Sequence, residues 1–294
     1  MAITLTQLRT FLAVARTGAV HAAARQLYVS QPSVSAALAA LEREVGADLV
    51  ERHGRGIRLT QAGEAFAPYA AKILGLVSAG QRAALETVRP EASRVRIVAV
   101  STAGEFVLPP LIQAHRALRP EVEVLLEVAN RKTVLERLES WSADIGVGGR
   151  PQGADVVGRA FLDNRLVVVG REVPRSLDDA VWLLREEGSG TRAATEAFLA
   201  ERRIEPRDVL TLGSNGAIKQ ALLLGLGITL VSDWAVAREL ADGRLVQIPA
   251  RGTPLVRPWY ALRPRGPSPR PAVRDFLAFL HSEAARQVAQ RTIS

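Results

Sequence analysis

The first 46 residues alternate apolar and polar positions at the three- and four-residue spacing of amphipathic helices. One helix is expected to begin near Leu5 and to end at Gly18. Residues 22–35 then predict a short helix, a tight turn and the start of a second helix, which Ser30 caps and Gly46 ends. This is the layout of a helix-turn-helix, whose second helix enters the major groove of DNA. An ordinary helical hairpin is the alternative, since short motifs give false positives.

The second of these helices carries polar side chains near its N-terminus that we expect to point outward, toward DNA. Pro32 suits its first turn. A hairpin wing is expected over residues 49–59, where short apolar ends flank a Gly-rich basic tip whose arginines can reach phosphate or a minor groove. A solvated turn is the alternative for the wing. The candidate DNA-binding residues are Ser30, Gln31, Pro32, Ser33, Ser35, Arg52, Arg55 and Arg58.

Beyond the wing, Thr60 is a candidate cap for a long helix that ends near Arg89 and Pro90. Apolar residues follow one another along it in alternating steps of four and three, with Gly80 in one gap: Ala62, Phe66, Tyr69, Ile73, Leu76 and Ala83. That spacing is typical of a coiled-coil seam and predicts a dimerisation helix. Packing of the helix on its own chain is the alternative.

From Arg94 onward, short apolar runs alternate with helical patterns, which is the rhythm of a mostly parallel sheet covered by helices. The Asp242-Gly243 pair predicts a turn, and the proline-rich residues 264–271 predict a break. The expected strands are 95–100, 122–128, 145–147, 166–169, 181–184, 209–212, 228–231, 245–248 and 257–262, and the expected helices are 108–118, 133–141, 191–203, 215–224 and one final helix to about 290.

Ligands of open parallel sheets bind beyond the carboxyl ends of the strands, where helix N-termini also gather. In the turn 188–192, two glycines let backbone N–H groups converge on an anion. Ser189 and Thr191 supply hydroxyl groups, and Arg192 supplies a positive charge. Capping for Ser101 and Thr102, solvation for Arg131 and Lys132, and a plain turn at 188–192 are the alternatives. The candidate effector-binding residues are Ser101, Thr102, Asn130, Arg131, Lys132, Gly148, Arg150, Gly188, Ser189, Gly190, Thr191, Arg192 and Asn215.

Composition adds little to this picture. The 294 residues are enough for two or three packed units, and 48% are hydrophobic. The formal net charge of +8 favours polyanionic partners. However, residues 1–93 hold 10 basic and 7 acidic side chains and residues 94–294 hold 28 and 23, so the excess is not concentrated in the expected DNA-binding end. The chain has no cysteine, which excludes disulfides, thiolate metal sites and cysteine nucleophiles.

Several function classes find no support in the sequence. We find no signal peptide and no apolar run long enough to cross a bilayer, so a cytoplasmic protein is expected. There is no P-loop, no G-x-S-x-G and no H-E-x-x-H, so an enzyme is not expected. The four histidines lack metal-ligand spacing, and no metal or cofactor is expected. A cytoplasmic solute-binding protein remains the alternative for the C-terminal part.

The N-terminal residues resemble those of LysR-type transcriptional regulators. The resemblance is carried by Leu8-Arg9-Thr10-Phe11, Ser30-Gln31-Pro32-Ser33-Val34-Ser35, Leu41-Glu42, Gly46, Leu49, Glu51-Arg52 and Leu59-Thr60-Gln61-Ala62-Gly63. It implies a winged helix-turn-helix, a dimerising linker helix and a two-lobed α/β effector domain like the type II periplasmic binding proteins. It also implies a homodimer that assembles into a tetramer, binds and bends double-stranded promoter DNA, and contacts RNA polymerase under the control of a small effector.

Three downstream stretches, residues 127–131, 185–192 and 214–220, are similar to CbbR-like regulators of carbon-fixation operons. Regulators of this subgroup respond to phosphorylated or otherwise anionic metabolites. The expected division is a DNA-binding domain over 1–60, a linker helix over 61–89 and an effector domain over 94–294. In that domain, lobe I covers about 94–163 and 265–294, and lobe II covers about 164–264.

Two departures from the family pattern change the expected details. Ala36 and Ala37 stand where recognition helices often carry long polar side chains, so base readout leans on Gln31, Pro32 and Ser33 and on DNA shape. Ala19 replaces the usual capping serine of the first motif helix. That change weakens the cap by about 1 kcal/mol without altering the fold.

Overall fold

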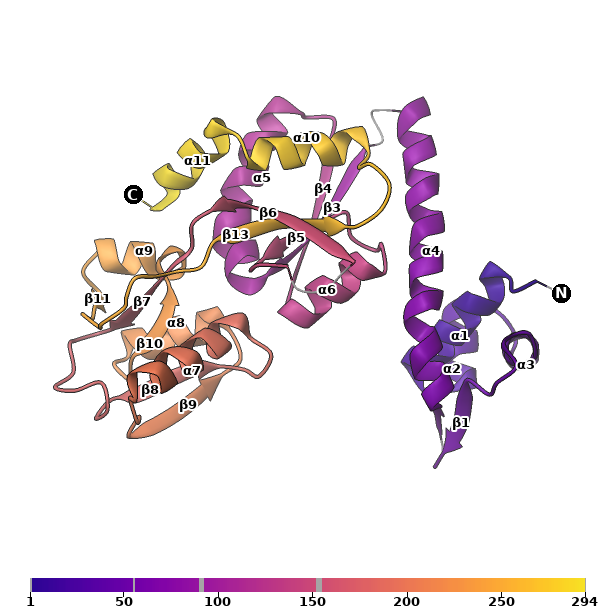
Figure 1. The fold of residues 1–294 in the computed structure, drawn as a ribbon, viewed down its shortest axis with the longest axis horizontal. Coiled ribbons are helices and arrows are strands. Elements are labelled where there is room, and N and C mark those ends of the chain that lie inside the picture. Colours follow the sequence, from indigo (N-terminus) through magenta and orange to yellow (C-terminus); the bar gives the residue numbers. More distant parts are fainter. Residues whose placement is uncertain (1, 55, 90–92, 152–154, 294) are drawn as a thin grey trace. The chain divides into compact units, whose positions relative to one another are not determined.

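The structure is a computed structural model that describes residues 2–54, 56–89, 93–151 and 155–293 (Figure 1). It separates into two compact units, Met1–Ala84 with Ser140–Ser142, and Leu85–Glu139 with Ala143–Ser294. The predicted division at residues 60, 89 and 94 stays a prediction. No helix in the part of the chain that the structure describes is long and apolar enough to span a membrane.

The first unit is a helix-turn-helix with a hairpin and a long helix. Thr4 and Gln7 form a capping box at the start of the first helix, and Gly18 and Gly46 end helices in the left-handed conformation. Thr60 accepts a hydrogen bond from the Gly63 N–H at 3.0 Å, so its predicted role as a cap is confirmed. The elements are α1 (Leu5–Thr17), α2 (Val20–Leu27), α3 (Gln31–Val45), the antiparallel pair β1 (Val50–His53) and β2 (Gly56–Leu59), and α4 (Gln61–Val88).

A single apolar core holds these helices together. Leu8, Phe11, Leu41 and Leu49 are almost fully buried in it. Burial of side chains of this size stabilises the fold by about 1.5–3 kcal/mol each. The start of α4 joins the same core, where the Phe66 ring packs on Phe11 with centroids 5.6 Å apart.

The predicted seam of α4 therefore divides into two parts. Ala62 and Phe66 pack against the core of their own unit. Farther along the helix, Tyr69 is 68% exposed, and Ile73 and Leu76 are also exposed. The alternative of packing on the same chain is thus correct for the first part of the seam, and the second part presents apolar side chains to its surroundings.

The second unit contains two lobes, and the first lobe is built on a five-stranded sheet in the order β4-β3-β5-β13-β6 (Figure 1). β3 is parallel to β4 and β5, whereas β13 is antiparallel to β5 and β6. The strands are β3 (Arg94–Val100), β4 (Glu123–Ala129), β5 (Ile145–Gly148), β6 (Val156–Leu162) and β13 (Trp259–Pro264), and the helices are η2 (Ala103–Val107, a π-helical turn), α5 (Leu108–Leu118), α6 (Arg131–Glu139), α10 (Pro271–Leu280) and α11 (Glu283–Ile293).

The other lobe has two small sheets. In one, β7 pairs antiparallel with β10, β11 and β12. In the other, β8 and β9 are parallel, and a bridge between Trp182 and Ile228 connects the two sheets. The elements are β7 (Arg165–Gly170), β8 (Val181–Arg185), α7 (Gly190–Arg202), β9 (Asp208–Leu212), α8 (Asn215–Leu223), β10 (Thr229–Ser232), α9 (Asp233–Ala241), β11 (Val246–Gln247) and β12 (Leu255–Val256).

Two sequence predictions for this unit are wrong in detail, and some of its elements, including α9, were not predicted. The sheets are mixed rather than mostly parallel, because the chain crosses between the lobes twice, near residues 163 and 257, and the strands that follow run in the opposite direction. The expected final helix is two helices, separated at His281 and Ser282. Strand β6 was not predicted, because its Gly158-Arg159-Ala160 segment is exposed and breaks the apolar pattern.

A buried group of charges fixes the last turn of α4 within the second unit. The Glu86 carboxylate accepts a hydrogen bond from the Ala272 N–H at 2.8 Å, at the start of α10, where no local side chain caps the helix. The Arg270 guanidinium binds Glu86, the Arg94 carbonyl at 2.8 Å and the Asp144 carboxylate at 2.9 Å. A carboxylate 186 positions away in the sequence thus satisfies helix N–H groups that would otherwise lack a partner.

Candidate DNA-binding surface and effector cleft

The turn of the helix-turn-helix leaves the N-terminus of α3 exposed. Tyr28 has the left-handed conformation that ends α2, and its side chain is 95% exposed. Ser30 caps α3, because its hydroxyl accepts the Ser33 N–H at 3.3 Å. Val34, Leu38 and Leu41 face the core. The predicted residues Gln31, Pro32, Ser33 and Ser35, around the start of the helix, are all exposed.

The wing is a hairpin, as predicted, and its arginines differ in their surroundings. Arg52 lies on β1 with its side chain exposed. Arg58 lies opposite Glu51 on β2 and forms an ion pair with it at 2.6 Å, so it reaches a phosphate only in competition with that carboxylate. Arg55 falls outside the described residues.

In the second unit, a cavity of about 80 Å³ lies between the two lobes. Strands β3, β4, β5 and β8 all end at it, in agreement with the rule for sheets of this kind. Seven of the predicted effector residues line it: Ser101, Thr102, Asn130, Arg131, Ser189, Gly190 and Thr191.

The cavity wall has features that suit an anion. The N-terminus of α7 lies at the wall, and Ser189 caps it by accepting the Arg192 N–H at 3.4 Å. The first N–H groups of a helix attract negative charge. Three cationic side chains, those of Arg131, Arg185 and Arg257, share the wall with one carboxylate, that of Glu186.

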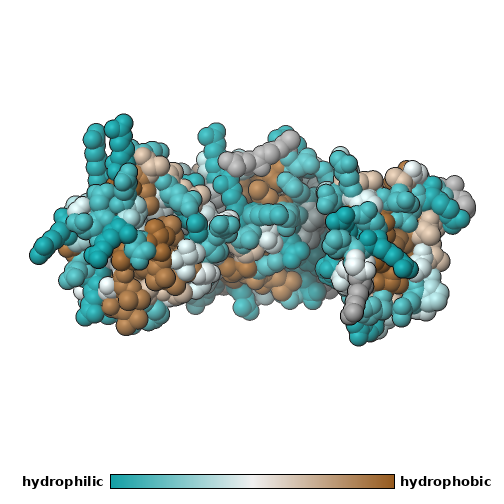
Figure 2. Space-filling view, turned by 90° about the horizontal axis from the view of Figure 1, so that it is seen from below, coloured by the Kyte–Doolittle hydropathy of each residue, from teal (hydrophilic) through white to brown (hydrophobic). Residues whose placement is uncertain are grey.

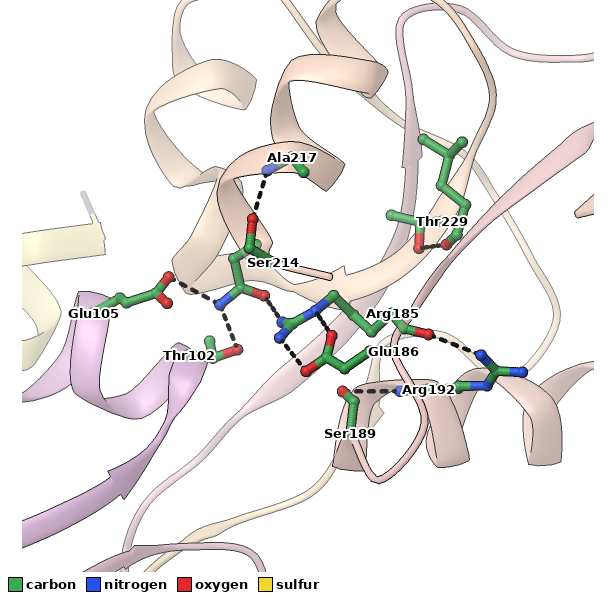
Figure 3. Close-up of polar contacts among 11 residues, drawn as sticks. Thr102, Glu105, Arg185, Glu186, Ser189, Arg192, Ser214, Ala217 and Thr229 are labelled. Atoms are coloured by element: carbon green, nitrogen blue, oxygen red, sulfur yellow. Dashed lines mark hydrogen bonds and ion pairs between the residues drawn. The ribbon is translucent and has the colours of Figure 1, made fainter. Parts of the chain in front are cut away.

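Arg185 is the centre of a hydrogen-bonded network that joins the lobes (Figure 3). Its side chain is only 6% exposed, and its Nε and Nη2 donate to the two carboxylate oxygens of Glu186 at 2.8 and 2.9 Å. Its Nη1 donates to the Oδ1 of buried Asn215. The Nδ2 of Asn215 in turn donates across the cleft to Glu105 at 3.0 Å and to Thr102 at 3.5 Å.

The other predicted effector residues lie elsewhere. Asn215 holds Arg185 from behind the cavity wall, as just described. Arg192 binds the Glu196 carboxylate at 2.7 Å and the Arg185 carbonyl at 3.1 Å, and with Gly188 it lines an adjoining groove. The Lys132 side chain is 84% exposed, and its ammonium group lies 3.9 Å from Glu136. The Arg150 carbonyl accepts a hydrogen bond from Arg131, and buried Gly148 ends β5.

Sequence reasoning missed several residues of the cavity wall. Arg185 and Glu186 stand at the carboxyl end of β8, so the strand-end rule could have found them. Asn164, Arg257 and Trp259 come from the two crossovers between the lobes, which sequence alone does not bring together. Asn164 Oδ1 and Trp259 Nε1 are buried without a hydrogen-bond partner among the residues that the structure describes. Such atoms are costly to leave unpaired, so a ligand or water that reached them would stabilise this arrangement of the cleft.

Comparison with known proteins agrees with this geometry. Residues 5–64 match the family "Bacterial regulatory helix-turn-helix protein, lysR family", and residues 89–285 match "LysR substrate binding domain". A RuBisCO operon transcriptional regulator of Allochromatium vinosum is 35% identical over 97% of this chain and 98% of its own length. The solute-binding alternative finds no support in these matches.

Two solved structures share the fold. The regulatory domain of Synechocystis PCC6803 CcmR in complex with 2-PG is 30% identical, covers 64% of this chain and 96% of its own, and has a TM-score of 0.59. Full-length CbnR complexed with its target DNA covers 98% of this chain and 100% of its own at a TM-score of 0.67, with 21% identity, and shows the fold alone. The chain belongs to the LysR family of bacterial DNA-binding transcriptional regulators, and within it to the group that resembles RuBisCO operon regulators.

Proposed function

We propose that this regulator binds a small anionic metabolite in the cleft between its lobes and that the metabolite controls how the protein binds and bends promoter DNA. The observation that carries the proposal is the cavity wall, where three arginines and the N-terminus of α7 surround a space of about 80 Å³. Cationic side chains and helix N–H groups in a confined space favour carboxylate and phosphate oxygens over neutral ligands.

The size of the cavity supports a metabolite of few atoms. Most binding sites for larger ligands occupy several hundred Å³. CcmR, whose regulatory domain is 30% identical to this chain, was solved with 2-PG. A phosphorylated or carboxylate metabolite of similar size is therefore the class we propose. In this scheme Ser189, Gly190 and Thr191 face the anion from lobe II, and Ser101, Thr102, Asn130 and Arg131 face it from lobe I.

For DNA, we propose that Gln31, Pro32, Ser33 and Ser35 read base edges in the major groove while Ser30 holds the start of α3. The exposure of these side chains at the N-terminus of a capped helix supports this role. Arg52, Arg58 and Arg55 supply phosphate or minor-groove contacts from the wing, and such contacts position the protein without reading sequence.

We further propose that the exposed part of the α4 seam is covered by a second copy of the chain, and that two such dimers form the tetramer that bends DNA and meets RNA polymerase. Tyr69, Ile73 and Leu76 keep the coiled-coil spacing and are exposed in the single chain. Apolar patches of this kind mark interaction sites when they are contiguous. Hydrophobic patches also interrupt the otherwise hydrophilic face in Figure 2.

A metabolite can change DNA binding only if its affinity differs between two arrangements of the protein. The Thr102–Asn215–Arg185 chain crosses the cleft, so an anion at Arg185 acts directly on the contacts that hold the lobes together. We propose that closure of the lobes around the anion is the step that favours one arrangement over the other.

Calorimetry with inorganic phosphate, 2-phosphoglycolate and a panel of small organic acids tests the proposal. The matched variants are Arg131→Ala, which changes the cavity wall, and Lys132→Ala, which removes the same charge one residue away on an exposed side chain. We expect the first to weaken anion binding about tenfold or more, the cost of a lost charge-assisted pair, and the second to leave it nearly unchanged.

DNA binding is read in parallel by fluorescence anisotropy on the region upstream of the protein's own gene. The preferred metabolite is expected to change the affinity or the bend of the wild-type complex, and Arg131→Ala is expected to reduce that response. Equal anion affinities of the two variants would contradict the assigned cleft. A wild-type protein that prefers its own upstream region no more than random DNA would contradict the regulatory role.

A further inference from the structure

We propose that Glu186 is a built-in substitute for the effector, a carboxylate that pairs with Arg185 and that the effector must displace. The proposal rests on the proposed anion site. It concerns a residue that determines how tightly, and with what selectivity, that site binds its ligand.

The first reason is the shape of the contact. A guanidinium binds a carboxylate or a phosphate through two parallel N–H···O hydrogen bonds. Glu186 makes this two-pronged contact with Nε and Nη2 of Arg185 at 2.8 and 2.9 Å (Figure 3). The remaining donor edge is used by Asn215, so an incoming anion meets its best partner already occupied.

The second reason is the difference in burial between the two partners. The Arg185 side chain is 6% exposed, whereas that of Glu186 is 37% exposed. Moving Glu186 away returns a partly exposed carboxylate to water, but it leaves the buried charge of Arg185 without compensation until an anion takes the same position. Because Arg185 is the buried partner, the exchange proceeds by movement of Glu186 while Arg185 stays in place.

The third reason is the charge pattern of the wall. Glu186 is the one carboxylate among the lining residues that the structure describes, and it stands beside the two cationic side chains of Arg131 and Arg257 as well as Arg185. If Glu186 stayed in place, its negative charge would repel the same anion that the arginines attract. Exchange at Arg185 removes the conflict, because one anion takes the position of another.

The exchange also sets a minimum affinity that an anion needs in order to bind, and it links binding to the other lobe. Competition with a tethered carboxylate lowers the apparent affinity, so weakly bound anions are excluded and only a ligand that outcompetes Glu186 is retained. Because Arg185 also holds Asn215, which reaches Thr102 and Glu105 in the other lobe, the exchange is transmitted across the cleft.

The test compares Glu186→Gln with Glu187→Gln in the full-length protein. Both remove one negative charge from adjacent positions, but Glu187 is exposed and lines only the adjoining groove. Calorimetry with inorganic phosphate and with 2-phosphoglycolate is expected to give about tenfold tighter binding for Glu186→Gln, the effect of removing one close charge pair. For Glu187→Gln, binding within about twofold of wild type is expected, because exposed charges are screened.

Crystals grown with either probe should show the anion on Nε and Nη2 of Arg185 and the Glu186 side chain turned away. Unchanged or weaker binding by Glu186→Gln, or a structure with Glu186 still on Arg185 beside the bound anion, would overturn the exchange while leaving the anion site intact. Binding of neither probe by wild type or by either variant would overturn the proposed function as well.

Discussion

Two pairs of arginines, one pair in each unit of this chain, lie in contrasting environments. In the helix-turn-helix unit, Arg52 is exposed, and Arg58 pairs with Glu51 through side chains that are 59% and 45% exposed. In the effector unit, the side chains of Arg185 and Arg270 are at most one tenth exposed, and each is held by buried or half-buried carboxylates. The exposed arginines can bind a polyanion such as DNA. The buried arginines are held in ion pairs within the folded unit.

The comparison indicates that the exposure of an arginine determines how much stability the protein should lose when that arginine is replaced. An exposed ion pair contributes little to stability, because water already solvates both charges. A buried pair contributes little more in net terms, but removing one partner leaves the other charge without compensation. Substitutions of these two kinds of arginine should therefore be measured by different assays, namely DNA affinity for the exposed ones and unfolding for the buried ones.

The largest effect is expected for Arg270→Ala. It leaves Glu86 and Asp144 as uncompensated carboxylates in a buried site and should destabilise the effector unit by about 3–5 kcal/mol. Urea unfolding followed by tryptophan fluorescence measures this, because Trp182, Trp234 and Trp259 are buried in the effector unit.

The control for that measurement is Arg58→Ala, which breaks an exposed ion pair in the other unit. We expect it to change stability by less than about 1 kcal/mol while weakening DNA binding. Similar losses of stability in Arg270→Ala and Arg58→Ala would contradict the expectation that only the buried arginine matters for stability.

A second comparison lies within the DNA-binding unit, between the start of α3 and the wing. Gln31→Ala should cost about 1–3 kcal/mol at particular base pairs and relax preference there. Arg52→Ala should weaken binding to all sequences alike and lower the dependence on salt concentration, since a phosphate contact releases counterions. Anisotropy titrations on a set of single-base variants, at two salt concentrations, separate the two outcomes. A uniform loss for Gln31→Ala would contradict a base-reading role.

The same contrast explains how far the sequence could predict each site. The proposed DNA-binding surface at the start of α3 is contiguous in sequence, since residues 30–35 form one helix start whose cap, proline and exposed polar positions follow from local rules. The helices of this unit, the hairpin and the cap at Thr60 were all predicted correctly for that reason.

The effector cleft is assembled from strand ends and crossovers that lie far apart in sequence. Ser101, Asn130 and Ser189 could be found because they follow predicted strands or begin a predicted helix. Asn164 and Trp259 could not, because their position depends on where the chain crosses between the lobes. The charge partners were equally hidden: no local pattern indicates that Glu86 caps a helix that begins 185 positions later.

A smaller effect is expected from a buried histidine in the effector unit. His115 is 2% exposed and packs on the rings of Phe276 and Phe279, and burial, with the nearby Arg119, lowers its pKa from 6.5, while Asp275 and Glu121 oppose the shift. Because the folded-state pKa is lowered, the unfolded chain binds more protons as the pH falls below 6.5. Stability from this group is thus complete above pH 6.5 and decreases as the pH falls toward the folded pKa.

Urea midpoints of wild type and His115→Gln between pH 7.5 and 5 measure this contribution. The difference between the two proteins should change over that range, with the wild type losing relative stability at the acid end. A constant difference would show that His115 does not titrate differently in the folded and unfolded chains.

The smallest predicted effect comes from the uncapped helix of the DNA-binding unit. Ala19 has the extended backbone of an N-cap, with φ −157° and ψ 136°, but no side chain accepts the free N–H groups of α2, as its sequence predicted. Ser30, at the start of the next helix, shows the hydrogen bond that Ala19 cannot make. Ala19→Ser should therefore stabilise this unit by about 0.5–1 kcal/mol and leave anion binding unchanged, since the cleft belongs to the other unit. Far-UV circular dichroism of thermal unfolding detects a gain of that size, and a loss of stability would mean that the hydroxyl at position 19 competes with the contact between the Thr17 hydroxyl and the Ala19 carbonyl.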